Sequence, residues 1–285
     1  MPHDDSDDIR MLPNLFEAFT YSYKDFFNID HISTMAGWEN GADHTQFVNV
    51  HQSFRITDTN KQNISSGITA AGLNYKNRSE TFSFNIFDFY IHEAVNVIYI
   101  ESSFTVNLLK NYNLTLSAQY DNYAGVDSFF MVDRNATFND FDSTVTGFLA
   151  KLEFTKAHLT LSFATNKVSG ADAPLRSLGS GPYFSSMEYN TIDGVVTNDA
   201  SSVMSSLSYD ASEKIKGLKL SYFYGTFESG EKSVDLVEQN FVLEYENKDY
   251  FTLTMAYTTV ENAISTGTAD FVLFRTFLDF PIETY

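Results

Sequence analysis

The sequence lacks cysteine altogether, and it is poor in tryptophan, proline and basic residues. It has 285 residues with no Cys, one Trp and 5 Pro, and 18 Lys and Arg stand against 37 Asp and Glu. Without Cys the chain can form no disulfide, thiolate metal site or thiol nucleophile. The formal net charge of -19 repels phosphates, so nucleic acid is not an expected partner.

Long apolar runs are missing as well. No stretch approaches the roughly 20 consecutive apolar residues of a membrane-spanning helix. The start is acidic, with Asp4, Asp5, Asp7 and Asp8 where a secretory signal would carry positive charge. Aromatic residues make up 16% of the chain, which argues against disorder. This composition fits either a soluble protein or a transmembrane β-barrel, whose alternating strands dilute the hydrophobicity.

Apolar and polar residues alternate along much of the chain, as in β-strands with two different faces. Leu114, Leu116 and Tyr120 fall on one face of a segment whose other face carries Asn113 and Gln119. Such alternation predicts about thirteen strands, near 14–23, 27–36, 65–75, 79–91, 95–106, 113–122, 143–154, 158–166, 200–210, 216–226, 234–246, 249–259 and 268–280. Most have about ten residues, which a tilted strand needs to cross a bilayer. We therefore predict an all-β fold, a transmembrane antiparallel β-barrel.

The connections between these strands support the barrel interpretation. Short turns near 24–26, 76–78, 155–157 and 247–248 contrast with long connections near 37–64, 123–142 and 167–199. Outer-membrane barrels have short periplasmic turns and long outer loops, and bacterial ones have an even number of strands. Because the predicted strand count is odd, we expect residues 1–285 to form a single barrel domain that is N-terminally incomplete.

The polar strand faces would line the lumen of such a barrel. They carry a set of charged residues: Glu101, Lys151, Glu153, Lys219, Glu238, Glu244 and Arg275. A soluble β-sandwich binding module is an alternative, in which these charges would face bulk water. We expect the long connection 167–199 to fold inward and form a constriction, with Arg176, Glu188 and Asp193 facing the pore.

Patterns for catalysis and metal binding are sparse. His92-Glu93 is not followed by the second His of a metalloprotease helix. Residues 133–142 are rich in Asp and Asn, but they lack the Gly and the terminal Glu of an EF-hand calcium loop. We expect no enzyme and no cofactor, with calcium as a possible ligand and any metal site unknown. An outer-membrane barrel hydrolase is an alternative, and it would need a Ser–His pair on one barrel wall.

Three segments carry a resemblance to a known family. Residues 176–193 (RSLGSGPYFSSMEYNTID) resemble a loop segment of the OprD-like (Opr family) outer-membrane porins, particularly the major outer membrane proteins of epsilonproteobacteria. Residues 8–18 (DIRMLPNLFEA) and 35–41 (MAGWENG) look like segments of the same family that occur well inside the chain. The resemblance covers essentially the whole sequence, in order.

The resemblance implies an eighteen-stranded barrel in the cell outer membrane of a Gram-negative bacterium. Our thirteen strands would correspond to strands six to eighteen of that barrel. The implied function is passive diffusion of ions and small hydrophilic solutes through a water-filled pore. The net negative charge predicts a preference for cations. The expected partners are the lipid bilayer, small hydrophilic solutes and cations, and a homotrimer is a possible assembly.

Overall fold

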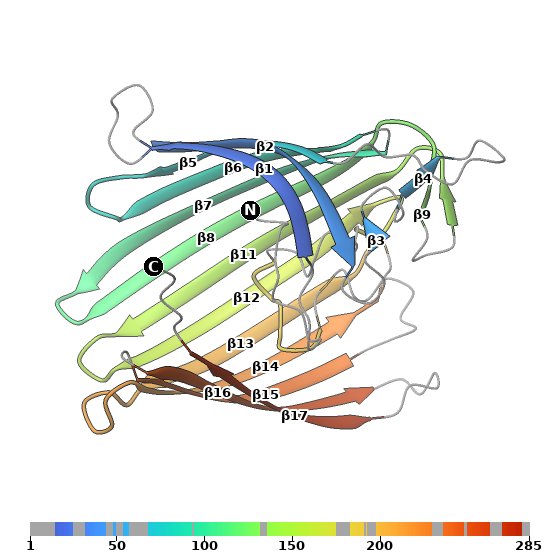
Figure 1. Cartoon of the computed structure of the whole chain (residues 1–285). Helices are drawn as coiled ribbons and strands as arrows, with labels where there is room; N and C mark the ends of the chain where they lie inside the picture. The colour runs from blue at the N-terminus through green and yellow to red at the C-terminus, as the bar shows by residue number, and fades with distance from the viewer. Residues whose placement is uncertain are drawn as a thin grey trace.

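The computed structural model describes the backbone of most of the chain. The described residues are 15–24, 32–43, 48–49, 54–56, 68–92, 94–131, 136–174, 183–190, 192, 198–229, 236–247, 250–262 and 270–280. Side chains are described from Thr69 onward, except those of 129–136. Within these residues the chain consists mainly of long β-strands, drawn as arrows in Figure 1. None of their helical turns is long and apolar enough to cross a membrane.

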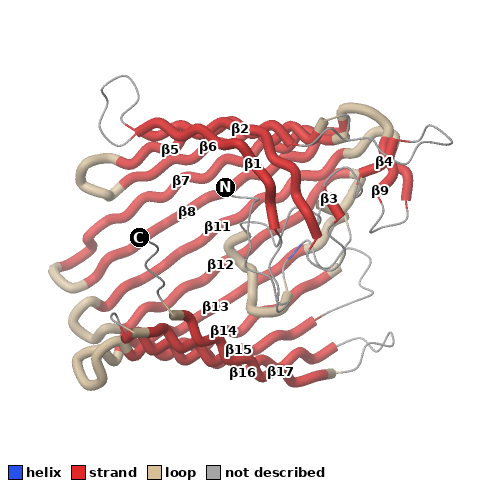
Figure 2. The backbone as a smooth tube through the Cα atoms, viewed as in Figure 1, coloured by secondary structure: helices blue, strands red, loops and turns tan. Residues whose placement is uncertain are grey.

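The main sheet of the described residues has 14 strands, of which thirteen form one continuous path and the short β3 (Val48–Asn49) pairs with β2. The strands of the path are β1 (Leu15–Lys24), β2 (Ile32–Asp43), β5 (Ile68–Lys76), β6 (Phe82–Ile91), β7 (Val95–Leu109), β8 (Tyr112–Gly125), β11 (Asp142–Phe154), β12 (Leu159–Gly170), β13 (Ser201–Asp210), β14 (Leu218–Glu228), β15 (Leu236–Asn247), β16 (Phe251–Asn262) and β17 (Phe271–Asp279). Each pairs antiparallel with the next, from β1 at one edge to β17 at the other. The sheet curls strongly along this path (Figure 2).

All thirteen predicted strands are present, in the predicted order. The largest error concerns the strand predicted at 27–36, which is β2 at Ile32–Asp43. Residues 37–64 are predicted to form a long connection, but β1 pairs with β2 well beyond residue 37, from Leu15 opposite Ala42 to Lys24 opposite Ser33. The long connection therefore begins after Asp43 and not near residue 37.

The other two long connections also differ from their predicted bounds. β8 continues to Gly125, and the connection that follows it contains the short strands β9 (Phe129–Met131) and β10 (Ala136–Phe138). They form a separate three-stranded sheet with β4 (Phe54–Ile56), in which β9 is central and pairs with both β10 and β4. β12 continues to Gly170, so the third long connection is 171–200 rather than 167–199.

Long and short connections lie at opposite ends of the sheet, as the sequence predicts. The connections after β5, β7, β11, β13 and β15 are short and share the end at the left of Figure 1. The long ones after β2, β8 and β12 leave from the other end. The connections after β6, β14 and β16 are exceptions, because they also follow strands at the long-loop end but comprise only 92–94, 229–235 and 263–270.

The two faces of the sheet differ in chemistry. The convex face exposes large apolar side chains, among them Phe104 at 52%, Phe241 at 53% and Phe274 at 59% of their surface. On β8 this apolar face runs from Tyr112 to Tyr120. Eight steps of about 3.4 Å, tilted by about 40°, rise about 21 Å, which approaches the apolar band of about 25 Å around an outer-membrane barrel.

Aromatic side chains mark the short-turn edge of this apolar band. Tyr112 and Phe154 meet edge to face at 5.4 Å between ring centroids, and Tyr245 lies 6.0 Å from Phe251. Such girdles occur where barrel strands pass through the membrane interface. A soluble sandwich would bury these apolar faces against a second sheet, whereas here they are the outer surface.

The concave face is buried near the long-loop end. Its core cluster includes Phe89, Ile91, Val97, Tyr123 and Phe227, which are at most 2% exposed. Ile192, from the connection 171–200, is also buried there. Part of this connection therefore lies against the inner face of the sheet, where it is visible in front of the strands in Figure 1.

Candidate functional site

Residues 183–190 of the connection 171–200 form a compact inner segment on the concave face. Backbone hydrogen bonds from Ser186 N to Tyr183 O (3.1 Å) and from Met187 N to Asn190 O (2.9 Å) fold it into two turns. Tyr183 and Ser185 are buried, whereas Tyr189 is exposed at 37%. A segment with both polar and apolar side chains is thus held inside the curl of the sheet.

An amide cluster, formed by Gln119, Asn166 and Ser202, holds the first half of the inner segment. Gln119 Oε1 accepts hydrogen bonds from Phe184 N and from Asn166 Nδ2, both at 2.9 Å. Asn166 Oδ1 accepts from Ser185 N at 2.9 Å and from Ser185 Oγ at 2.8 Å. Ser185 Oγ also bonds Ser202 Oγ at 2.5 Å. Because these side chains come from β8, β12 and β13, the segment is tied to three strands.

Gly147 of β11 leaves the space that the amide cluster occupies. A Cβ at this position would collide with Asn166 Nδ2 and Gln119 Oε1. The glycine therefore allows the two amides to meet directly over β11.

Tyrosine hydroxyls extend these contacts around Asp121. Tyr123 donates to Asp121 Oδ2 at 2.7 Å, and its oxygen lies 2.6 Å from the Tyr183 hydroxyl. Asp121 and Tyr123 are fully buried. A buried carboxylate is costly unless hydrogen bonds compensate its lost hydration, and these hydroxyls contribute that compensation.

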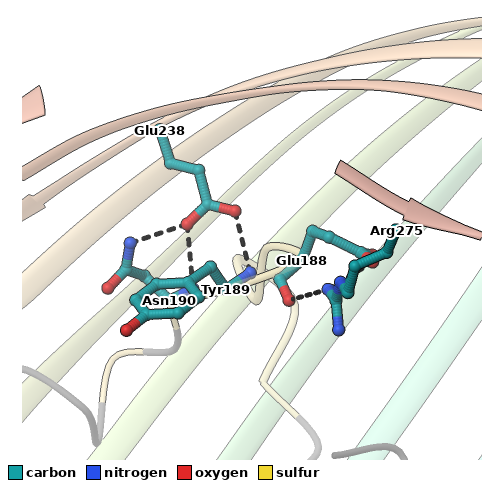
Figure 3. A network of polar contacts seen from close by, with 5 residues as sticks. All are labelled: Glu188, Tyr189, Asn190, Glu238 and Arg275. Atoms are coloured by element: carbon teal, nitrogen blue, oxygen red, sulfur yellow. Dashed lines mark hydrogen bonds and ion pairs between the residues drawn. The ribbon is translucent and has the colours of Figure 1, made fainter. Parts of the chain in front are cut away.

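The second half of the inner segment contacts the opposite part of the sheet, which Figure 3 shows from close by. Glu238 of β15 is fully buried, and both its oxygens accept hydrogen bonds. Tyr189 N donates to Oε1 at 2.8 Å, and Asn190 N and Nδ2 donate to Oε2 at 2.8 and 2.7 Å. The carboxylate thus binds two consecutive backbone amides.

Arg275 of β17 binds the same half of the segment. Its Nη2 donates to the backbone oxygen of Glu188 at 2.8 Å and forms an ion pair with the Glu188 carboxylate (Figure 3). The ring of Tyr189 packs against Phe271 at 4.7 Å between centroids. β17 therefore contributes both a charged and an aromatic contact.

The inner segment joins strands that are far apart in the sheet. β8 and β17 are seven steps apart along the sheet path, which would be about 34 Å in a flat sheet. Five extended residues, as from 184 to 188, span at most about 17 Å. The side chains of Gln119 and Arg275 bridge part of the difference, and the curvature seen in Figure 2 accounts for the rest. The segment therefore lies across the concave space.

The predicted site residues fall into three groups. Glu188, Glu238 and Arg275 meet at the inner segment. The other strand residues lie on the same concave face. Glu101 lies opposite Gln119 of the amide cluster, and four residues are closer to the short turns: Lys151, Glu153, Lys219 and Glu244. Arg176 and Asp193 lie outside the described residues, as does part of the calcium loop suggested at 133–142. That these residues line a pore stays a prediction.

Sequence reasoning missed the amide cluster and Tyr123. Alternation placed Gln119 on the polar face, but it gave no reason to single it out among the Thr, Ser and Asn around it. Tyr123 was assigned to a loop that begins at residue 123, whereas β8 continues to Gly125. The extended alternation of Gln119, Asp121 and Tyr123 was the signal that could have found them.

Each basic side chain described on the concave face has a carboxylate partner. Lys151 contacts Glu153 at 2.6 Å, Lys219 contacts Glu244 at 2.9 Å, and Arg275 pairs with Glu188. Lys76, near the short turns, pairs with Glu80 at 3.1 Å. The carboxylates of Glu238 and Glu101 accept hydrogen bonds from neutral groups, which for Glu101 is the Tyr99 hydroxyl at 2.5 Å. Within the described residues, no three His, Asp or Glu side chains gather as a metal site would require.

Comparison with known proteins gives a consistent result for the fold. Neither a protein-family model nor a curated protein sequence matches the chain. Among solved structures, OpdK of Pseudomonas aeruginosa with vanillate matches at a TM-score of 0.74 and 16% identity, covering 99% of this chain and 72% of that one. A BenF-like porin of Pseudomonas fluorescens matches at 0.78 and 14% identity, with 99% and 72% covered.

A third structure, OccK2 (OpdF) of Pseudomonas aeruginosa in complex with glucuronate, matches at a TM-score of 0.76 and 15% identity, covering 99% of this chain and 76% of that one. These identities establish likeness of fold alone. The all-β barrel class predicted from sequence is thereby confirmed, as is the structural resemblance to Opr-type porins. The chain has the fold of the outer-membrane β-barrel porins.

Proposed function

We propose that the protein is an outer-membrane porin through which ions and small hydrophilic solutes diffuse passively. The observation that carries this proposal is the exposure of large apolar side chains on the outer surface of the sheet. Large apolar groups such as Phe241 and Phe274 cover the convex surface, and polar groups line the part of the concave surface toward the short turns. Lipid favours the first face and water the second. The neighbours in fold are porins and not enzymes, which supports the same function.

The concave face near the short turns suits a water-filled passage. Hydroxyl groups meet across strands there, with Ser103 and Ser117 at 2.7 Å and Ser208 and Ser221 at 2.8 Å. A hydroxyl donates as well as accepts hydrogen bonds, so it can exchange its partners for those of a passing solute. The inner segment would narrow this passage at the long-loop side and limit the size of the solutes that cross.

A preference for cations is the finer part of the proposal. The cations of the concave face are paired with carboxylates, while Glu101 and Glu238 are held by neutral donors. The field inside the lumen should therefore be negative, in line with the net charge of -19. Rings of carboxylates select cations in other channels.

Single-channel recording tests the proposal. The purified protein is inserted into a planar bilayer between unequal KCl solutions, and conductance and reversal potential are measured. We expect discrete ohmic steps and a reversal potential of the sign that K⁺ permeation gives. Discrete steps with an anion-selective reversal potential would refute the cation preference and leave the porin function standing. Membranes that hold the protein and show no steps would contradict the porin function.

A further inference from the structure

We propose that Glu238 and Arg275 are positioning residues that hold the inner segment across the lumen, and that their main role is not to present charge to the solute. The inference rests on the proposed porin function for its transport consequences. It assigns to these two residues control over the width of the passage.

The direction of their hydrogen bonds supports this role. Glu238 accepts from the backbone amides of Tyr189 and Asn190, and Arg275 donates to the backbone oxygen of Glu188. Bonds to the main chain fix where the chain runs, whatever its side chains are. Three consecutive residues of the segment are held in this way from β15 and β17.

The burial of the Glu238 and Arg275 side chains supports the positioning role as well. Glu238 is fully buried, and the side chain of Arg275 is 13% exposed. By contrast, the ion pair of Lys219 and Glu244 exposes 51% and 43% of its side chains. Ions that pass through water can come close to the exposed pair, so Lys219 and Glu244 can act on them despite screening. Glu238 is enclosed by the segment that it binds.

The two halves of the segment are held by different chemistry. The amide cluster binds the first half through neutral hydrogen bonds from β8, β12 and β13, whereas charged groups bind the second half. Charge-assisted hydrogen bonds are roughly twice as strong as neutral ones, and removing one partner leaves the other unsatisfied. Loss of Glu238 should therefore free the second half from residue 186 onward, while the amide cluster still retains residues 184 and 185.

A thiol at position 186 reports this movement without any transport measurement. The chain contains no Cys, so Ser186→Cys provides a single thiol. Ser186 Oγ is buried and makes no hydrogen bond with the described residues, so sulfur replaces it without loss of a contact. The rate of maleimide labelling of the full chain in detergent then measures how often the segment leaves the wall.

Glu238→Gln is the main variant, because it keeps the shape of the side chain and turns one acceptor oxygen into a donor that faces N–H groups. We expect S186C/E238Q to label at least about tenfold faster than S186C alone, since a lost charge-assisted bond corresponds to such a factor. In bilayers E238Q should raise the single-channel conductance and the solute size limit. Glu213→Gln is the matched control: its carboxylate is 74% exposed in the turn after β13 and pairs with His158.

The outcomes separate this inference from the porin function. Faster labelling in S186C/E238Q than in S186C, with S186C/E213Q unchanged, supports the positioning role. This holds even if the wild type conducts no ions, because absent conductance would refute only the porin function. Labelling as slow as in S186C alone would overturn the positioning role. If the wild type conducts ions, an E238Q conductance that changes no more than that of E213Q would overturn it as well. If E238Q does not fold, Arg275→Gln decides instead, because it removes the bond to the Glu188 backbone and should also speed labelling.

Discussion

Phe241 on β15 is the side chain that best tests which face of the sheet meets lipid. It is 53% exposed on the convex face and lies four residues from Tyr245 at the edge of the apolar band. Four tilted strand steps rise about 10 Å, which places Phe241 near the middle of a band about 25 Å tall. A Lys at the bilayer midplane costs about 2–4 kcal/mol. Phe241→Lys should thus shift the folding equilibrium by roughly 30- to 900-fold.

The assay is a urea titration of the protein folded into phospholipid vesicles, followed by fluorescence. Val242→Lys is the matched control, because its neighbouring position points to the concave face and its charge would meet water. We expect F241K to lose the predicted 2–4 kcal/mol and V242K less than about 1 kcal/mol. If F241K were neutral or stabilising and V242K strongly destabilising, the convex face would not contact lipid, and the barrel interpretation of the two faces would fail.

Three further predictions concern the concave face. Tyr123→Phe should lower the free energy of unfolding by about 1–3 kcal/mol, measured by urea titration, because buried Asp121 loses a hydroxyl donor. Gly147→Val should speed the labelling of a thiol at position 186, because its side chain would displace the amide cluster. Lys219→Met should strengthen cation preference, seen as a larger reversal potential, because it leaves the partner carboxylate unneutralised.

Each of these predictions has a control and a contradicting result. Tyr224→Phe changes an exposed tyrosine, and equal stability of the two variants would show that the Tyr123 hydroxyl contributes nothing. Unchanged labelling in the Gly147 variant would mean that the amide cluster does not hold the inner segment. Lys216→Met removes a charge in the turn after β13, and an equal shift of reversal potential there would refute a local effect of Lys219.

Alternation alone predicted most of this fold because strand periodicity is a local property. Leu114, Leu116 and Tyr120 fall on the outer face whatever the rest of the chain does. The error at β2 has a physical cause, since glycine is a poor strand former and the pairing with β1 overrides its preference. The local sequence does not contain the pairing with a neighbouring strand. The observed strand ends therefore differ from the predicted ones, whereas the number and order of the strands agree.

The inner segment shows where prediction from sequence ends. Periodicity assigned Glu238 and Arg275 to the concave face, but their contacts lie 48 to 49 and 87 residues away in the chain, as from Asn190 to Glu238 and from Glu188 to Arg275. Such contacts depend on how far the sheet curls, which the pattern of one strand does not contain. The face of the sheet on which a side chain lies could be predicted, whereas its contact partner and its burial could not.

The central claim is that small hydrophilic solutes cross the membrane through a lumen narrowed by the inner segment. Osmotic swelling of vesicles that contain the protein, with uncharged sugars of increasing size, tests this claim most directly. We predict rapid swelling with the smallest sugars and a steep fall in rate with size, with the limit moved to larger sugars in E238Q. Vesicles with folded, inserted protein that swell no faster than empty vesicles with any sugar would contradict it.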